Sequence, residues 1–188
     1  MESGEFCVTL TRILSFLNSE VHVHTVRFLG NIEAKTDAKG RAFLPAVMRK
    51  VLQSAGEERL VLRRDVFQPC LVLYPESVWN EQMDTLRRRL SRWNREHQDI
   101  YRRFVAEAET VVLDGSGRFL IPRRCQQQAA IGQEIRFVGM GDTIEIWAAG
   151  EAAEALGQTP SLGPALERLM GQASDAEGSS GCVFGSEG

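Results

Sequence analysis

One nine-residue pattern occurs twice in this chain and constrains its fold more than any other feature. It reads Asp-x-x-Gly-Arg, then three residues ending in Leu or Ile, then Pro; it occupies residues 37–45 and returns 77 positions later, without a gap, as residues 114–122. An Asp side chain can accept hydrogen bonds from backbone amides ahead of it, and Gly adopts the positive φ that a tight turn needs. Pro cannot donate to a β ladder but suits the first turn of a helix. Each copy therefore predicts a strand, a turn, a return strand and a short helix, with six residues specifying the two turns: Asp37, Gly40, Pro45, Asp114, Gly117 and Pro122.

The segments that follow each copy repeat the same order of elements. After Pro45, apolar residues at helical spacing predict a helix that ends at Gly56, and Pro122 opens a shorter helix that ends before Gly132. Alternating or continuous apolar runs then predict strand pairs in both halves. The predicted strands cover residues 29–36, 59–63, 70–74, 110–113, 119–121, 134–138 and 143–147.

The residues between the two copies predict a helical pair with a break near residues 94–97. Apolar side chains recur every three or four residues, namely Trp79, Met83, Leu86, Leu90 and Trp93. The opposite face is strongly basic and contains Arg87, Arg88, Arg89, Arg92, Arg95, Arg102 and Arg103. We favour a solvated face with acidic partners on the same helices for these arginines; a nucleic-acid surface is the alternative.

The net charge of -3 conceals an uneven distribution along the chain. Residues 27–150 carry twenty Lys and Arg against sixteen Asp and Glu, whereas residues 151–188 carry six acidic residues and a single Arg. The folded part is therefore mildly basic, which permits an anionic partner without requiring one.

Several classes of function are disfavoured by the residues present. The four cysteines are scattered without a C-x-x-C pair, which indicates reduced packing thiols and argues against disulfides or a metal site. No apolar run approaches the ~18–20 residues of a membrane span, and no secretory leader is recognisable. Neither a paired-carboxylate frame nor a Ser or Cys nucleophile beside a His is recognisable. The sequence thus predicts a cytoplasmic protein that is not an enzyme and has no catalytic, cofactor-binding or metal-binding residues.

Each repeat is only about 45 residues long, which is marginal for an independent core. Its open strand edges also need a partner. Pairing of the two copies meets both needs, so we predict an α+β fold in which repeats 28–76 and 109–150 form one pseudo-twofold β barrel. Residues 77–108 are then an inserted helical pair.

The two ends of the chain are expected to lie outside this body. Residues 1–27 are interpreted as an N-terminal extension, either untranslated in the cell, with Val26 as an alternative start, or disordered. His22 and His24 share one face of a strand there but lack a further ligand, so we interpret them as incidental. Residues 151–188 are expected to be an acidic, Gly/Ser-rich flexible tail with short helices at 152–156 and 165–170.

These motifs resemble a known group of bacterial regulators. Residues 111–147, with Leu-Asp-Gly-Ser-Gly-Arg-Phe-Leu-Ile-Pro, are similar to the swapped-hairpin domain of the SpoVT/AbrB transition-state regulators. Two such domains around a helical insert, the first with Asp37-Ala38-Lys39-Gly40-Arg41, resemble the MraZ family over residues 28–150. Members of that family are transcriptional regulators encoded at the head of the bacterial division and cell-wall gene cluster.

The resemblance implies a nucleoid-associated repressor of that gene cluster, including its own operon. It also implies a ring of identical subunits that binds short direct repeats of double-stranded DNA through β-hairpin turns. Carried over by position, the DNA-binding residues are Lys39 and Arg41 in the first turn and Arg118 in the second. Ser116 stands where the first turn has Lys39, so we expect the first turn to read DNA and the second to be more structural.

Two alternatives stay open at the level of the sequence. Arg41 and Arg118 can each pair with the Asp of their own turn and only brace the hairpin; for Arg41 we favour a DNA contact, because Lys39 makes its turn net positive. An antitoxin-like or structural module for protein interaction can also use this fold. Two fused copies with a helical insert favour the ring-forming regulator over that module.

Overall fold

The computed structural model describes residues 26–157 and 162–177, and the chain divides into two units after Ala148. Several predictions concern segments outside the described residues. These are the extension up to residue 25 with Cys7, His22 and His24, and the last part of the tail with Cys182. The two units are described separately below.

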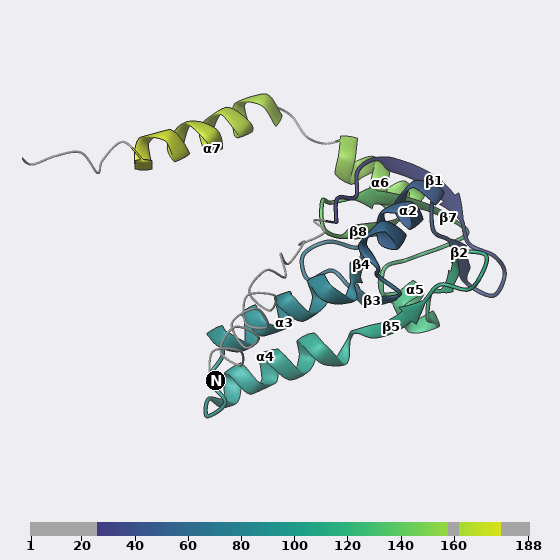
Figure 1. Ribbon diagram of the computed structural model, residues 1–188, viewed down its shortest axis with the longest axis horizontal. Helices are drawn as coiled ribbons and strands as arrows, with labels where there is room; N and C mark the ends of the chain where they lie inside the picture. The colour runs from purple at the N-terminus through teal and green to yellow at the C-terminus, as the bar shows by residue number, and fades with distance from the viewer. Residues whose placement is uncertain (1–25, 158–161, 178–188) are drawn as a thin grey trace, which may run out of the picture. The chain divides into compact units, whose positions relative to one another are not determined.

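The described strands of the first unit form a six-stranded sheet and a separate two-stranded ribbon (Figure 1). The sheet has the order β1-β7-β8-β4-β3-β5, the ribbon pairs β2 with β6, and every one of these pairings is antiparallel. The prediction of an α+β fold is therefore confirmed, with an antiparallel sheet among the described strands. The strands are β1 (Asn31–Lys35), β2 (Arg41–Phe43), β3 (Arg59–Arg64), β4 (Leu71–Pro75), β5 (Glu109–Val112), β6 (Arg118–Leu120), β7 (Glu134–Gly139) and β8 (Ile144–Ala148).

The two halves of the chain interleave within the sheet. β1 pairs with β7 of the other half, and β5 pairs with β3, so that Ile32 lies opposite Phe137 and Leu60 lies opposite Val111. The hairpins β3–β4 and β7–β8 join where β4 pairs with β8. Each half thus supplies the neighbour for the first strand of the other half. Among the described residues, β1 and β5 are the edge strands of the sheet. A single isolated bridge, between Thr36 just after β1 and Ala42 of β2, connects this edge to the ribbon.

Two helices follow the ribbon strands and complete the core. α2 (Ala46–Ala55) and α5 (Arg123–Gln128) begin directly after Pro45 and Pro122, where a fixed φ suits the helix start. α2 ends at Gly56, which has a left-handed φ of 70°, as the sequence predicted.

The buried residues come from both halves and form one hydrophobic cluster. Phe119 of the ribbon meets Phe137 of β7 edge to face, with ring centroids 6.4 Å apart. Cys70 and Cys125 are buried free thiols, which confirms their predicted packing role, and burial raises the pKa of both. Val26, which the sequence assigned to the extension, is also buried in this core, so the folded part includes it.

The helical insert consists of α3 (Glu76–Arg89) and α4 (Arg95–Ala106), which run side by side away from the sheet (Figure 1). Trp79 is its buried anchor and stacks on Phe104, with ring centroids 5.5 Å apart. The prediction that Trp93 belongs to the apolar stripe is wrong, because α3 ends at Arg89 and Trp93 lies in the connection, 98% exposed. Asn94 caps α4 by accepting a hydrogen bond from the His97 N–H, close to the predicted break.

The second unit contains α6 (Ala149–Gly157) and α7 (Leu162–Glu177). Both helices are longer than predicted, and α7 continues past Gly171, where composition predicted irregular chain. Throughout the described ranges, each helix is too short or too polar to traverse a lipid bilayer.

Candidate nucleic-acid interface

The first turn, from Asp37 to Arg41, is organised by the carboxylate of Asp37. Its Oδ1 accepts hydrogen bonds from the backbone N–H groups of Lys39 and Arg41, both at 2.9 Å, and its Oδ2 accepts from Arg41 Nε at 2.7 Å. Gly40 has a φ of +79°, and its N–H donates to the Asp37 carbonyl at 2.9 Å. One side chain therefore fixes both the turn and the direction of the arginine.

The second turn has the same geometry to within a tenth of an ångström. Asp114 Oδ1 accepts from the N–H groups of Ser116 and Arg118, both at 2.9 Å, and Oδ2 accepts from Arg118 Nε at 2.8 Å. Gly117 has a φ of +81°. The sequence repeat thus produces the same local structure in both halves.

The two carboxylates are held in their charged form. Hydrogen bonds from the backbone N–H of Arg41 and of Arg118 are the main causes that lower the pKa of Asp37 and Asp114, with the guanidinium groups adding to the effect. From the arginine side chain, each aspartate accepts a hydrogen bond only from Nε. Within the part of the chain that the structure describes, the terminal nitrogens of Arg41 and Arg118 make no hydrogen bond to the protein. Bracing the turn and contacting a ligand are therefore compatible roles for each arginine.

The outer face of the ribbon connects the two turns. Arg41 lies opposite Leu120 and Phe43 lies opposite Arg118, so these four side chains alternate with the buried Ala42 and Phe119. Phe43 and Leu120 are 55% and 53% exposed, and the Arg118 guanidinium lies 5.5 Å from the centre of the Phe43 ring. The ribbon therefore presents two cations and two apolar side chains on one exposed surface, with a turn at each end.

Each turn is also tied to the opposite half of the chain. The Gly117 carbonyl accepts a hydrogen bond from the Leu44 N–H, and the Gly40 carbonyl accepts one from the Ile121 N–H, both at 3.0 Å. The turns cannot move independently of the ribbon without breaking these bonds.

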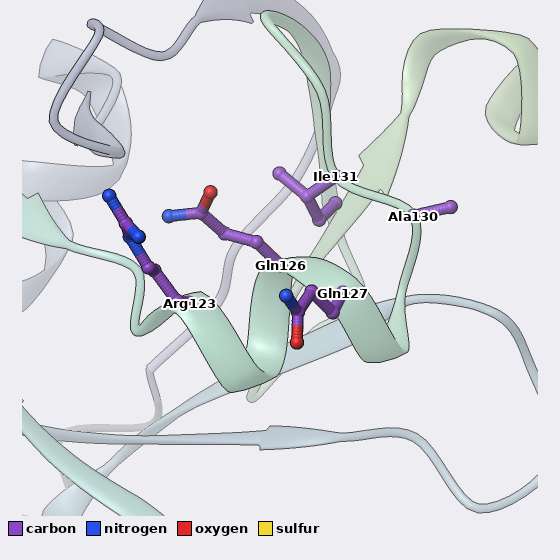
Figure 2. A pocket seen from close by; sticks show the side chains of 5 residues that line it. All are labelled: Arg123, Gln126, Gln127, Ala130 and Ile131. Carbon is purple, nitrogen blue, oxygen red and sulfur yellow. The ribbon is translucent and has the colours of Figure 1, made fainter.

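A helix of the opposite half covers each turn glycine. A Cβ on Gly40 would lie 2.0 Å from Gln126 Nε2 of α5, and a Cβ on Gly117 would lie 2.4 Å from Arg49 Nη1 of α2. Figure 2 shows Gln126 and Arg123 projecting their polar ends to one side of α5, around a surface hollow that Ile131 also lines. Sequence reasoning missed Arg49 and Gln126. Extending the repeat comparison to the fourth residue after each Pro would have paired them.

The predicted DNA-binding residues lie in two separate turns. Lys39 is exposed at the tip of the first turn, whereas Arg41 and Arg118 are partly covered by their aspartates. The arginines of the insert lie elsewhere: Arg102 pairs with Asp99, and Arg87 lies 4.9 Å from the Tyr101 ring centre. Across the described residues, no three His, Cys, Asp or Glu side chains come together as a metal site.

Comparison with known proteins identifies similar sequences over most of the chain. The model of a family described as "MraZ protein, putative antitoxin-like" matches residues 28–103 and 104–151. A relative from Phocaeicola vulgatus, named "Transcriptional regulator MraZ", is 56% identical over 152 residues, which cover 81% of this chain and 99% of the relative.

Two further relatives carry the same name. The one from Bacteroides thetaiotaomicron is 52% identical over 153 residues, covering 81% of this chain and 98% of the relative. The one from Flavobacterium psychrophilum is 33% identical over 150 residues, covering 79% and 95% respectively.

Proposed function

The chain belongs to the MraZ family, and from this membership and the geometry of its turns we propose that it is a sequence-specific DNA-binding transcriptional regulator. The observation that carries the proposal is that both turns have the same geometry, in which an aspartate binds the arginine side chain through Nε alone. The terminal nitrogens of such an arginine match guanine O6 and N7, a contact worth ~1–3 kcal/mol of discrimination. Because the aspartate already orients the guanidinium, less side-chain entropy is lost on binding. The names of the relatives support a role in transcription, and they fit the prediction of a non-enzyme.

The three cationic side chains of the turns have different proposed roles. Arg41 reads a base edge in the major groove, which is wide enough for a two-stranded β ribbon. Lys39, exposed at the same tip, contacts a phosphate and adds affinity without sequence preference. Arg118 braces the second turn, the more structural of the two by the sequence comparison, and we propose that its terminal nitrogens also contact DNA.

The interleaved strand pairing supports a specific version of the fold. We propose that repeats 28–76 and 109–150 form the pseudo-twofold swapped-hairpin barrel of the SpoVT/AbrB type, with residues 77–108 as an inserted helical pair. The exchange of β1 and β5 between the halves and the matched ribbon strands favour this arrangement.

Assembly into a ring would make this interface effective. One pair of turns with a few cationic contacts binds DNA weakly at physiological salt. Several identical subunits placed on successive direct repeats raise the affinity through effective concentration, and cyclic symmetry places all their turns on one face. We therefore propose a homo-oligomeric ring on the nucleoid that represses the division and cell-wall gene cluster, including its own operon.

A second candidate function is an antitoxin-like module that binds another protein. The exposed Phe43 and Leu120 favour it, because apolar side chains at the centre of a surface are typical of protein interfaces. The description of the matching family also names antitoxin-like proteins. We rank it second, since the cations of the turns flank these apolar residues.

A gel-shift assay with the region upstream of the protein's own gene tests the proposal. We expect a shift that is competed by the unlabelled fragment but not by scrambled DNA, and whose affinity falls steeply as salt rises. The same weak affinity for both DNAs would contradict sequence-specific regulation and would favour the protein-binding alternative.

A further inference from the structure

We propose that Arg49 makes the second turn a binding site for a DNA phosphate. Arg49 belongs to the first half of the chain, and its charge takes the place of the lysine that the second turn lacks at Ser116. The inference rests on the proposed function and changes one part of it. Comparison of the turns alone assigns two cations to the first and one to the second. The structure places a second cation at the second turn, from α2 of the first half.

The position of Arg49 is defined by contacts with the second turn. Its Nη1 donates a hydrogen bond to the Ser116 carbonyl at 3.2 Å, and its guanidinium packs on the Cα of Gly117, where the absence of a side chain leaves room. Ser116 is the residue that corresponds to Lys39. The charge of Arg49 is therefore delivered next to the position where the first turn carries its lysine.

The matched position in the other half carries a neutral residue. Gln126 occupies the fourth position after Pro122, as Arg49 does after Pro45, and it lies over Gly40 of the first turn. The first turn thus has Lys39 with a neutral cover, and the second has Ser116 with a cationic cover. Each end of the ribbon carries two cations near its turn glycine, one of them the arginine that follows that glycine.

The acidic neighbours of Arg49 do not form ion pairs with it. Glu57, Glu58 and Asp114 line the same surface hollow, but none of them lies within salt-bridge distance of Arg49 in the described structure. Arg49 is half-buried, with its Nε buried and its Nη1 bonded to the Ser116 carbonyl, so Nη2 is the part of the guanidinium that we propose meets an external phosphate. A purely structural role, in which Arg49 only offsets these acids, is the competing explanation that the test must separate.

The test compares Arg49→Gln, which introduces the residue found at the matched position Gln126, with a control variant and a rescue variant. Lys50→Gln is the matched control, because it makes the same charge change on the same helix, where the other half also carries a glutamine, Gln127. Arg49→Gln with Ser116→Lys is the rescue, because it gives the second turn the lysine of the first. Each variant is titrated with the upstream DNA over a salt series, and its oligomer is checked by light scattering.

We expect Arg49→Gln to weaken specific binding about tenfold and to lower the slope of log affinity against log salt by about 1 for each engaged subunit. Lys50→Gln should have a much smaller effect, and Ser116→Lys should restore most of the loss. Thermal stability should fall only slightly, because the hydrogen bond to the Ser116 carbonyl is lost, and oligomer size should not change.

Equal effects of Arg49→Gln and Lys50→Gln on DNA affinity would overturn the inference, as would a loss of affinity that Ser116→Lys does not restore. Arg41→Ala, measured in the same series, separates this inference from the proposed function. If Arg41→Ala abolishes binding while Arg49→Gln leaves it unchanged, only the role of Arg49 is wrong. If the wild-type protein shows no specific binding, the proposed function fails as well.

Discussion

Each turn aspartate accepts three hydrogen bonds, two from backbone amides and one from an arginine, and this explains why a carboxylate is needed there. An Asn could accept some of these bonds but would not neutralise the guanidinium. The turn pattern was predictable from the sequence because all of its bonds are local, within four residues of the Asp. Arg49 was not predictable from the turn itself, because its contact depends on the pairing of the two halves.

The lowered pKa of Asp37 and Asp114 predicts a pH dependence of stability. A folded-state pKa below the ordinary 3.8 means that these groups stabilise the fold fully above that pH and lose the effect as pH falls through the lowered value. We expect the melting temperature of the double variant Asp37→Asn, Asp114→Asn to lie below that of the wild type by a constant difference between about pH 5 and 8. This difference in melting temperature should shrink as the pH falls below 3.8, as measured by thermal unfolding; a difference that keeps its full size at low pH would show that the charge is not the cause.

Gly40 provides a second prediction at the scale of single residues. Gly40→Ala adds a Cβ at positive φ, costing roughly 1 kcal/mol, and displaces Gln126, whose hydrogen bond to the Ile121 carbonyl contributes roughly 1 kcal/mol more. Gly56→Ala is the matched control, because Gly56 also has positive φ but nothing within 4 Å of the added Cβ. Urea unfolding should show a loss of about 2 kcal/mol for Gly40→Ala and about 1 kcal/mol for Gly56→Ala. Equal losses would mean that the contact with Gln126 is not important.

At the scale of elements, the helical insert is attached to the sheet through a small cluster of aromatic residues. Arg63 of β3 is almost completely buried, and its guanidinium lies 4.0 Å from the centre of the Phe104 ring. Phe104 in turn stacks on Trp79, which also meets Tyr74 of β4 edge to face. These contacts position α3 and α4 relative to the strands and leave the rest of the pair solvated.

Phe104 therefore provides the test of how the insert is held. Phe104→Ala removes both the stack on Trp79 and the cation–π contact with Arg63. We expect this to lower the free energy of local opening of the helical pair by about 2 kcal/mol. Hydrogen exchange should rise in α3 and α4 and stay unchanged in β7 and β8. Trp93→Ala, at the exposed connection, is the control and should change stability by less than about 0.5 kcal/mol. Faster exchange throughout the sheet would show that the insert is part of the core.

The sequence predicted this helical pair but not its exact ends. The 3–4 spacing of apolar residues continues through Leu90 to Trp93, so periodicity alone extended the first helix too far. In the structure Leu90 is extended and Asn94 begins the next helix. Helix ends depend on capping and connection geometry, which periodicity does not contain.

At the scale of the whole molecule, the internal repeat explains both the fold and the proposed interface. A half-sized unit cannot cover its own strand edges, so the two copies exchange their first strands and share one core. The sequence predicted this pairing because both copies were incomplete in the same way. It did not predict that the sheet and the ribbon form separate ladders, the ribbon having strands of only three residues.

The same architecture places the two turns at opposite ends of one ribbon, each tied by a glycine carbonyl to the other half. Rigid, outward-facing turns are well suited to present arginines in a fixed geometry. Residues 151–188 carry six acidic residues and a single Arg, whereas residues 27–150 are mildly basic. A chain with a net charge of -3 can therefore still bind DNA locally through its turns.

The most direct measurement is the affinity of Arg41→Ala for the upstream DNA, compared with scrambled DNA and with light scattering of the same sample. The aspartate and the remaining backbone bonds keep the turn folded, so the oligomer should stay intact. Specific binding should fall to the level of scrambled DNA, since each subunit loses ~1–3 kcal/mol of base discrimination. An intact oligomer that still prefers the upstream DNA as strongly as wild type would contradict the account.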